Sequence, residues 1–414
     1  MEKELLRQIV IDQQDLFKKV DNLIERSVDL NYFLKGEEIV IISGIRRCGK
    51  SSLLKLISEK YDCIKIFVNF DDVRFVDFEI KNFQDLEEIF LEIGGQNKVV
   101  YFFDEIQNLK HWEKWVNNLH SKKIKVFITG SNANLLSSEI STYLTGRNKV
   151  IKLFPFSFKE YLNLKKIDST YSSTKEKVNL MKHFNNYFNI GGFPQVIKNE
   201  DLELSKQYFE DILNKDLIIR YKIKDIKELK DLIVFLLSNI GKINSYTTLK
   251  KITGIKSLST IKKYLDGFQN VFLLHQVNKF DYSINKQKVA PSKIYTYDNS
   301  FLKTVSFNFS ENFGKRLENL VFIHLLRTQK NVYYHLNKKE CDFIIKEGLK
   351  VKNAIQVTLN LDKLTKEREI TGLLEAMEKY NLKEGLILNL ENEETIKIEN
   401  KIVYIKPIWK WLLE

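Results

Sequence analysis

The amino-acid sequence predicts an α/β protein with a parallel sheet in its first part, a helical region in the middle and a second α/β domain at the end. Three observations carry this prediction. Short apolar runs alternate with stretches of helical period up to Pro155, the pattern is helical from about residue 177 to 240, and β-rich segments return after Asn312. With 414 residues, 43% of them hydrophobic, the chain has material for two or three packed cores, which excludes general disorder.

The first part is expected to alternate strands with helices after a helical lead-in over residues 1–35. Apolar runs typical of buried parallel strands occupy residues 38–42, 64–68, 99–103, 126–129 and 150–153. Stretches of helical period occupy residues 52–59, 83–92 and 112–120. This alternation predicts βαβ units and a parallel sheet covered on both faces.

Composition limits the partners and the compartment. Lys and Arg number 66 against 54 Asp and Glu, and the resulting charge of +12 favours an anionic partner such as nucleic acid, a nucleotide or a membrane surface. The three cysteines are too few and too widely spaced for a disulfide framework or a CxxC zinc site. We find no signal-peptide pattern and no apolar run of ~18 residues, so a soluble cytoplasmic protein without membrane contact is expected.

The strongest motif is a phosphate-binding loop. Residues 44–51, GIRRCGKS, fit G-x-x-x-x-G-K-[ST] completely, between an apolar strand and a helix. In such a loop, backbone N–H groups and the helix amino terminus face the phosphates, Lys50 meets the β- and γ-phosphates, and the Ser51 hydroxyl binds Mg²⁺. The residues expected to bind the nucleotide are Gly44, Ile45, Arg46, Arg47, Cys48, Gly49, Lys50, Ser51 and Ser52.

A second motif supplies acids for the same site. The strand over residues 99–103 ends in Asp104 and Glu105, the Walker B pattern, in which Asp104 holds Mg²⁺ and Glu105 polarises the attacking water as a general base. A whole strand, 64–68, lies in sequence between the P-loop strand and this one, which suggests a strand inserted between them in the sheet. That arrangement is typical of P-loop ATPases with a catalytic Glu.

Two further residues are candidates for catalysis. Ser131 follows the strand over 126–129, within the polar sequence 129–132, and fits a sensor of the γ-phosphate or the lytic water; a polar turn with a helix cap is the alternative. Arg147, after Thr145 and Gly146, fits an arginine finger acting in cis or on a neighbouring subunit, and an ordinary surface Arg is the alternative.

These motifs resemble a known family. The segments GIRRCGKSSLL, YFFDEIQNLKHWEKWVNNL, FITGSNANLLSSEISTYLTGR, LFPFSFKEYL and GGFPQVI resemble, in order, the prokaryotic AAA-type ATPases of largely unknown function. That resemblance implies ATP and Mg²⁺ as ligands, and a P-loop module followed by a winged helix and a restriction-endonuclease-like domain. We therefore expect an ATPase domain over 1–160, a helical lid-like region over 161–240, a winged-helix region over 241–310 and a restriction-endonuclease-like domain over 311–414.

The expected winged helix has a basic surface. Residues 245–268 predict a helix, a Gly-containing turn and a second helix, and the wing is expected from Val271 onward. The predicted core is Leu249, Ile252, Ile255, Ile261, Tyr264 and Leu265, and the predicted exposed residues are Lys250, Lys251, Lys256, Lys262 and Lys263. Exposed lysines suit phosphate contacts with duplex DNA; a packing module without DNA contact is the alternative.

The last domain carries an incomplete set of nuclease residues. By the resemblance, Glu318, Asp342 and Gln356 form a second metal site, with Gln356 where Glu is usual and Thr358 where a Lys is expected. Lys338, Lys339 and Lys352 are the nearby candidates to replace that Lys. A fold retained for binding or docking is therefore preferred over an active nuclease.

Together these observations predict an Mg²⁺-dependent ATPase whose nucleotide state acts on DNA binding or processing. An ATP-regulated nuclease and a nucleotide-switched module that docks a protein partner without DNA contact are the alternatives. Assembly into a homo-oligomer would matter for Arg147, which acts in trans only if subunits meet at the nucleotide.

Overall fold

The structure is a computed structural model that describes residues 1–19, 23–131, 146–306, 313–328 and 330–414. Internal contacts divide the chain into two compact units, Met1–Phe154 and Pro155–Glu414. Among the described residues, no helix is both long and apolar enough to cross a membrane.

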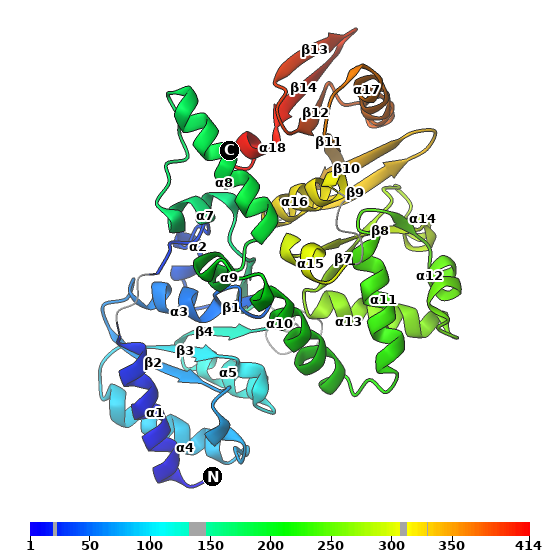
Figure 1. The fold of residues 1–414 in the computed structure, drawn as a ribbon. Coiled ribbons are helices and arrows are strands. Elements are labelled where there is room, and N and C mark those ends of the chain that lie inside the picture. Colours follow the sequence, from blue (N-terminus) through cyan, green and yellow to red (C-terminus); the bar gives the residue numbers. More distant parts are fainter. Residues whose placement is uncertain (20–22, 132–145, 307–312, 329) are drawn as a thin grey trace. The chain divides into compact units, whose positions relative to one another are not determined.

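The first unit is built on a parallel sheet of five strands (Figure 1). The strands are β1 (Ile39–Gly44), β2 (Ile64–Asn69), β3 (Val99–Asp104), β4 (Lys125–Gly130) and β5 (Asn148–Leu153). Every neighbouring pair is parallel, and each strand lies within two residues of its predicted bounds. The predicted parallel sheet is confirmed.

The strand order is β2-β3-β4-β1-β5, which corrects one detail. A strand does lie between β1 and β3, but it is β4 and not the strand over 64–68. Burial shows why β2 can stand at the edge: it alternates between buried and partly exposed residues, whereas β4 is buried throughout. Both runs are apolar in sequence, so the run alone does not say on which side of β3 a strand will pair.

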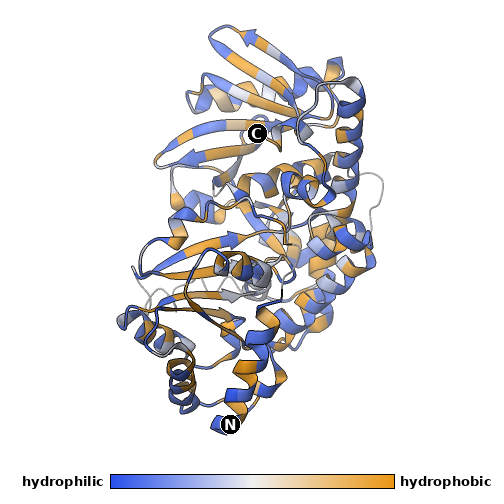
Figure 2. Ribbon diagram, turned by 90° about the vertical axis from the view of Figure 1, so that its left-hand side faces the viewer, coloured by the Kyte–Doolittle hydropathy of each residue, from blue (hydrophilic) through white to orange (hydrophobic). Residues whose placement is uncertain are grey.

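Helices cover both faces of this sheet. On one face, α1 (Lys3–Phe17), α4 (Asn82–Gly94) and α5 (Trp112–Ser121) share a core with every second residue of the strands. The alternate residues of β3 and β4 turn to the other face, where α3 (Lys50–Ser58) packs. The helix beside the N label in Figure 2, α1, carries both orange and blue, as expected of a helix with one buried and one solvated side.

The expected helical lead-in is only partly helical. It consists of α1 and the short α2 (Asn31–Leu34), whereas residues 23–30 between them are irregular. Two 3₁₀ turns, η1 (Val73–Phe75) and η2 (Ile106–Asn108), follow β2 and β3.

The second unit begins with helices, as predicted. They are α7 (Phe158–Lys165), α8 (Thr174–Ile190), α9 (Pro194–Asn199), α10 (Glu203–Asp211), the π-helix η4 (Ile212–Ile219) and α11 (Ile226–Ser238). The predicted polar loop over 165–176 separates α7 from α8. Ser173 ends that loop, because its hydroxyl and the Glu176 carboxylate form a capping box at the start of α8.

A glycine pair fixes the break after α8. Gly191 has φ +80°, and a Cβ there would lie 2.0 Å from an oxygen of Asp298. The Gly192 N–H donates to the other Asp298 oxygen at 2.7 Å. Only glycine allows the backbone to approach this carboxylate so closely, which explains the Gly-Gly of the GGFP segment.

A helix-turn-helix with a small antiparallel sheet follows. Its elements are β6 (Ile243–Asn244), α12 (Tyr246–Thr253), α13 (Leu258–Asn270), β7 (Leu274–Asn278), α14 (Ile284–Val289), β8 (Ser292–Thr296) and α15 (Asn299–Thr304), with the sheet order β6-β8-β7. Gly254 ends α12 with φ +74°, as the predicted turn requires. One core prediction is wrong: Ile252 is 51% exposed, because it lies on the solvent side of α12.

The wing prediction also needs correction. Val271 and Leu273 are buried in the turn between α13 and β7, and the excursion beyond β7 contains α14. A run of apolar residues such as 271–274 is typical of the base of a wing rather than of its exposed tip.

A mixed sheet of six strands closes the chain. Its elements are α16 (Phe313–Arg327), β9 (Asn331–Leu336), β10 (Glu340–Glu347), β11 (Lys350–Val357), α17 (Lys363–Lys379), β12 (Glu384–Asn389), β13 (Glu394–Ile398), β14 (Lys401–Pro407) and α18 (Ile408–Trp411), and the sheet order is β13-β14-β12-β11-β10-β9. The antiparallel meander β9-β10-β11 is followed by α17 and a parallel strand, β12. The predicted C-terminal α/β arrangement is present.

Candidate functional site

The phosphate-binding loop joins the carboxyl end of β1 to the amino terminus of α3. Gly44 is the last residue of β1, and a Cβ there would lie 2.0 Å from the backbone oxygen of Leu153 on β5. Gly49 precedes α3 with φ +99°, a conformation that other residues rarely adopt. The two glycines of the motif are therefore required for different reasons: close packing at Gly44 and backbone direction at Gly49.

Lys50 lies inside this loop. It is 5% exposed, and its ammonium donates to the backbone oxygens of Gly44 at 3.2 Å and Ile45 at 3.4 Å. The Glu105 carboxylate is 3.6 Å from the same nitrogen. Two carbonyls and one carboxylate thus hold the charge where a phosphate group is expected.

The two acids differ in their environment. Burial raises the pKa of Asp104, and the neighbouring charge of Glu105 adds to that effect. Burial opposes ionisation of Glu105, but the charges of Lys50 and Arg46 and the hydrogen bond from Gln107 together outweigh it, so the pKa of Glu105 falls below its usual value. Glu105 is therefore ionised at neutral pH, as a general base must be.

Hydrogen bonds tie both acids to neighbouring elements. The Asp104 carboxylate accepts from the hydroxyls of Ser51 and Thr129. The Glu105 N–H donates to the Thr129 oxygen at 3.0 Å, and Glu105 adopts a left-handed backbone with φ +51°. Thr129 belongs to the polar sequence 129–132 that indicated a sensor, but only Ser131 was predicted as a site residue.

Ser131 has an unusual buried hydroxyl. The residue is 1% exposed, and its hydroxyl oxygen has no hydrogen-bond partner within the described part of the chain. A buried hydroxyl normally has a partner, so a ligand is one way to satisfy it. The neighbouring Asn132, and Thr145 before Arg147, lie outside the described residues.

The remaining residues of the P-loop differ in charge, burial and backbone conformation. The charge of Arg46 helps to lower the pKa of Glu105. Cys48 is buried, and burial raises the pKa of its thiol. Arg47 adopts φ +70°, and Ser52 is exposed on α3.

Arg26 contacts the P-loop and was not predicted from the sequence. Its guanidinium donates to the backbone oxygens of Cys48 at 3.0 Å and Phe154 at 2.6 Å. It thereby holds the loop against the end of β5. It belongs to the irregular segment 23–30, where no motif marks it.

The structure does not bring Arg147 to the loop. Arg147 directly precedes β5, its backbone oxygen accepts from the Ile39 N–H at the start of β1, and its guanidinium donates to Asn117 at 2.6 Å. β1 and β5 are parallel, so Arg147 lies at the end of the sheet opposite to the P-loop. The expected finger in cis is wrong, because six residues of extended strand separate the two ends.

The predicted residues of the last domain do come together, in the second unit. Asp342 on β10 accepts from the Val357 N–H at 3.0 Å, and its own N–H donates to the Gln356 side chain at 3.1 Å. Glu318 on α16 is joined to Asp342 through Lys293 of β8, whose ammonium is 2.9 Å from both carboxylates. Glu340 is the third carboxylate on this ammonium, at 2.6 Å. We call Glu318, Glu340 and Asp342 the acidic centre.

None of the expected substitutes supplies the cation of this centre. Lys338 and Lys352 are exposed. Lys339 lines the same cleft as Glu318, Glu340 and Asp342, but no ion pair joins it to them among the described residues. The Thr358 hydroxyl donates to the Asn360 backbone oxygen at 3.1 Å. Among the described residues, no group of three or more His, Cys, Asp and Glu side chains is arranged to hold a metal ion.

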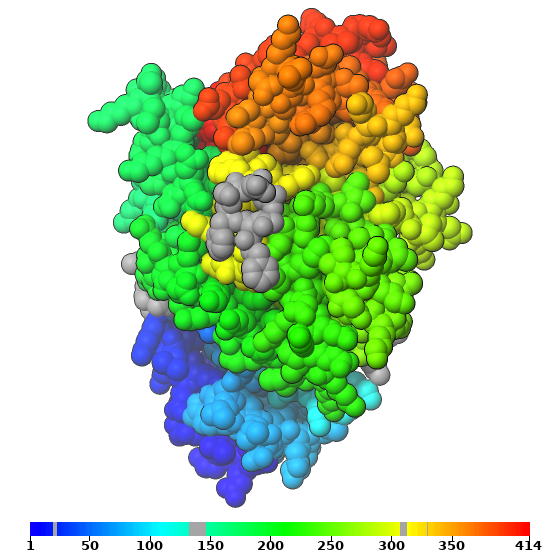
Figure 3. Space-filling model, turned by 45° about the vertical axis from the view of Figure 1, so that its right-hand side comes forward, coloured from blue at the N-terminus to red at the C-terminus, as the bar shows by residue number. Residues whose placement is uncertain are grey.

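The helix-turn-helix presents the expected basic surface. Lys250, Lys251, Lys256, Lys262 and Lys263 are all exposed. Three of them line a hollow of about 430 Å³ beside Gly254. This part of the chain lies in the yellow-green surface of Figure 3.

Comparison with known proteins agrees with this description. Residues 36–162 match the AAA domain family, and residues 181–312 match a domain of unknown function. An uncharacterized protein of Methanocaldococcus jannaschii, MJ1544, is 34% identical over 99% of this chain and 96% of its own length. An uncharacterized protein of Haemophilus influenzae is 33% identical over 91% of this chain and 94% of its own length.

Solved structures show weaker likeness. The replication initiator DnaA bound to AMPPCP and single-stranded DNA is 12% identical, with a TM-score of 0.28 over 63% of this chain and 86% of that one. The Thermotoga maritima RuvB Holliday junction branch migration motor is 14% identical, with a TM-score of 0.30 over 66% and 88%. Likeness at this level says nothing about what this chain binds.

The sheet order, the P-loop and the acid pair define a P-loop ATPase of the AAA type. The chain belongs to the family of prokaryotic AAA-type P-loop ATPases that includes these archaeal and bacterial relatives. Its first unit is the ATPase module, and its second unit joins a helical region to a C-terminal sheet domain.

Proposed function

We propose that this protein hydrolyses ATP with Mg²⁺ and couples its nucleotide state to the binding of duplex DNA. The observation that carries the first half is the contact of Lys50 with Glu105 at the P-loop, with Ser131 directly after the end of β4, the strand that pairs with β1. Lys50 and Glu105 are 3.6 Å apart, and the Ser131 hydroxyl lacks a partner among the described residues. ATP would satisfy all three groups.

Each side chain then has one task. Lys50 leaves its carbonyl partners and neutralises the β- and γ-phosphates. Glu105 accepts a proton from the water whose oxygen attacks the γ-phosphorus, and ADP leaves. Ser131 donates to a γ-phosphate oxygen or to that water.

Mg²⁺ fits the remaining oxygens. The Ser51 hydroxyl and the Asp104 carboxylate are already hydrogen-bonded to each other, so a cation between loop and strand would meet both. When bound, Mg²⁺ supplies charge neutralisation for the phosphates. The raised pKa of Asp104 would then fall, because a cation favours the ionised carboxylate.

DNA binding is assigned to the helix-turn-helix. Its support is the set of exposed lysines on α12 and α13, because lysine contacts phosphates without reading bases. Binding of this kind must weaken with salt, with a slope set by the number of phosphates contacted.

The test is steady-state ATP hydrolysis and duplex binding at two salt concentrations. We compare the parent with the K250A/K251A/K256A variant and with K175A/K177A/K206A, which removes three exposed lysines from α8 and α10. We expect the first variant to lose salt-sensitive DNA binding and the second to keep it. If the parent binds no duplex and DNA does not change its rate of ATP hydrolysis, the protein-docking alternative is favoured instead.

The nuclease alternative has weaker support. Glu318, Asp342 and Gln356 do converge, which supports a restriction-endonuclease-like fold, but Thr358 leaves the expected lysine position without a cation. We propose that the fold is retained for binding or docking. Metal-dependent DNA cleavage by the parent that is lost in D342A would contradict this assignment.

A further inference from the structure

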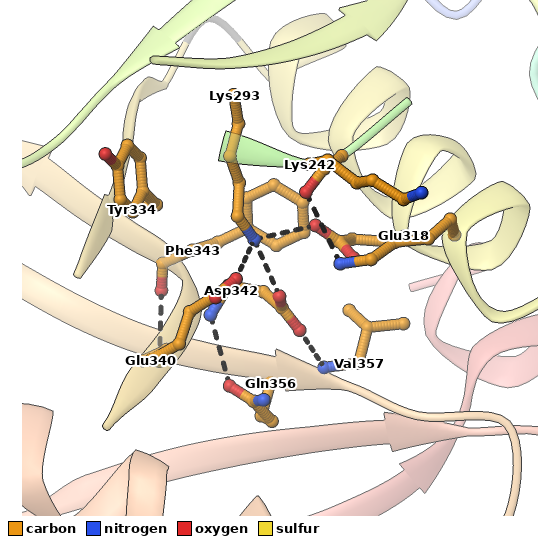
Figure 4. A network of polar contacts seen from close by, with 12 residues as sticks. Lys242, Lys293, Glu318, Tyr334, Glu340, Asp342, Phe343, Gln356 and Val357 are labelled. Carbon is orange, nitrogen blue, oxygen red and sulfur yellow. Dashed lines mark hydrogen bonds and ion pairs between the residues drawn. The ribbon is translucent and has the colours of Figure 1, made fainter. Parts of the chain in front are cut away.

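The acidic centre contains a cation that belongs to another part of the fold. Lys293 lies on β8, in the small sheet of the helix-turn-helix, and its side chain is 0% exposed. Its ammonium contacts Glu340 at 2.6 Å and both Glu318 and Asp342 at 2.9 Å. Figure 4 shows the side chain pointing from β8 toward these carboxylates.

The second oxygens of Asp342 and Glu318 are also engaged. The second Asp342 oxygen accepts from the Val357 N–H, and the second Glu318 oxygen accepts from Lys315 at 2.6 Å. The Tyr295 hydroxyl, two residues from Lys293 on β8, donates to Glu318 at 2.5 Å. β8 thus places two donors on the centre, and the carboxylates are held in position by protein groups.

The net charge of the acidic centre shows that Lys293 takes the position of a cation. Three carboxylates face the two ammonium groups of Lys293 and Lys315, which leaves one net negative charge. Without Lys293 the centre would carry two, the charge that one divalent cation balances.

A cleft reaches the same carboxylates from the other side. It has a volume of about 540 Å³ and is lined by Glu318, Asp342 and Gln356, together with Lys315 and Arg368. Lys293 is not part of this lining and lies behind the carboxylates. A small cation entering from the cleft would therefore meet carboxylates that the two ammonium groups leave with one net negative charge instead of two.

We propose that Lys293 is the resident cation of the acidic centre and excludes a divalent metal from it. Mg²⁺ or Mn²⁺ enters only when the ammonium leaves, so metal binding and insertion of Lys293 are mutually exclusive. This goes beyond the ATPase and does not depend on the P-loop. It also gives β8 a function: it is the strand of the small sheet whose side chain closes the centre.

The test measures Mn²⁺ binding to the full chain without nucleotide, by the loss of the free Mn²⁺ signal in electron paramagnetic resonance. The parent is compared with K293M, K293M/D342N and K315M. The last variant is the matched control, because it makes the same charge change beside Glu318, one of the three carboxylates, and leaves Lys293 in place. We expect one bound Mn²⁺ per chain in K293M alone, with at least tenfold tighter binding than in the other three.

Several results would overturn the proposal. They are Mn²⁺ binding by the parent that D342N abolishes, a folded K293M that binds no Mn²⁺, and K315M binding as tightly as K293M. If K293M does not fold without metal, folding restored by Mn²⁺ supports the proposal. If K293M folds neither with nor without Mn²⁺, we measure K293Q in the same way, because this variant keeps a hydrogen-bond donor. Binding of Mn²⁺ by K293Q supports the proposal, and no binding overturns it.

A cleavage assay separates exclusion from catalysis. Supercoiled plasmid is incubated with Mn²⁺ and each variant. The proposal expects no nicking by the parent. Nicking by the parent that K293M abolishes would make Lys293 a group acting on the phosphate, and the proposal would be wrong.

Discussion

Replacing Glu105 with Gln should separate nucleotide binding from hydrolysis. The amide keeps the size of the side chain and removes its charge and its ability to accept a proton from water. General bases contribute about 100- to 10,000-fold to a rate, so we expect turnover to fall by that factor. The left-handed backbone of Glu105 is compatible with the change, because φ +51° suits Gln no worse than Glu.

The same substitution should tighten ATP binding. The Glu105 carboxylate lies 3.6 Å from the Lys50 nitrogen, which at an effective dielectric constant of about 20 corresponds to about 5 kcal/mol of attraction. Phosphates must compete with that attraction for Lys50. Solvent and rearrangement cancel much of it, but about 1.4 kcal/mol released to binding would lower Kd tenfold.

The assay pairs a nucleotide titration with single-turnover hydrolysis. E59Q is the control, because it changes an exposed carboxylate at the end of α3 in the same unit. Hydrolysis by E105Q at the parental rate would refute the assignment of the base. Weaker ATP binding by E105Q, with intact folding, would refute the competition between Glu105 and phosphate for Lys50.

Four further substitutions test the two units. Lys50→Ala should abolish ATP binding in a titration with a fluorescent nucleotide, and retained binding would contradict its role. Ser131→Ala should lower turnover about tenfold with an unchanged melting temperature, because the buried hydroxyl has no partner in the described chain to lose. Gly44→Ala should destabilise the first unit by about 1–3 kcal/mol in urea unfolding, since its Cβ would meet the Leu153 oxygen. Burial lowers the pKa of His324 to about 4, so on acidification the unfolded chain binds the proton before the folded chain does. The free energy of unfolding should therefore fall between pH 6.5 and pH 4. His324→Phe should remove up to about 3 kcal/mol of that loss, and an unchanged dependence of stability on pH would contradict this.

Local motifs were predictable because the chemistry is local. A phosphate loop needs Gly44, Gly49, Lys50 and Ser51 within one turn between strand and helix, and the structure places them there. The acid pair after β3 was equally readable, because parallel strands of a sheet end on the same side. The expected strands followed from apolar runs alone.

Contacts between distant elements were not predictable in this way. The sequence suggested Lys338, Lys339 and Lys352 for the acidic centre because they are near Asp342 along the chain. Lys293, which does reach it, is 49 residues away, on a strand whose pattern predicts only burial. The arginine finger in cis at Arg147 was wrong for the opposite reason. The direction of β5, and not sequence distance, decides which end of the sheet Arg147 occupies.

Two of the buried lysines, Lys50 and Lys293, differ in whether a ligand can replace the partners of the ammonium group. Lys50 faces a single carboxylate at 3.6 Å and two neutral carbonyls, so an arriving phosphate offers a stronger partner than those it loses. Lys293 faces three carboxylates within 2.9 Å, and no single ligand replaces them. The number of carboxylates around the ammonium group therefore distinguishes Lys50, which a ligand can recruit, from Lys293, which occupies the position of a cation. By that reasoning, removing Glu105 should make Lys50 easier to recruit, whereas removing any one partner of Lys293 should leave it buried on the other two.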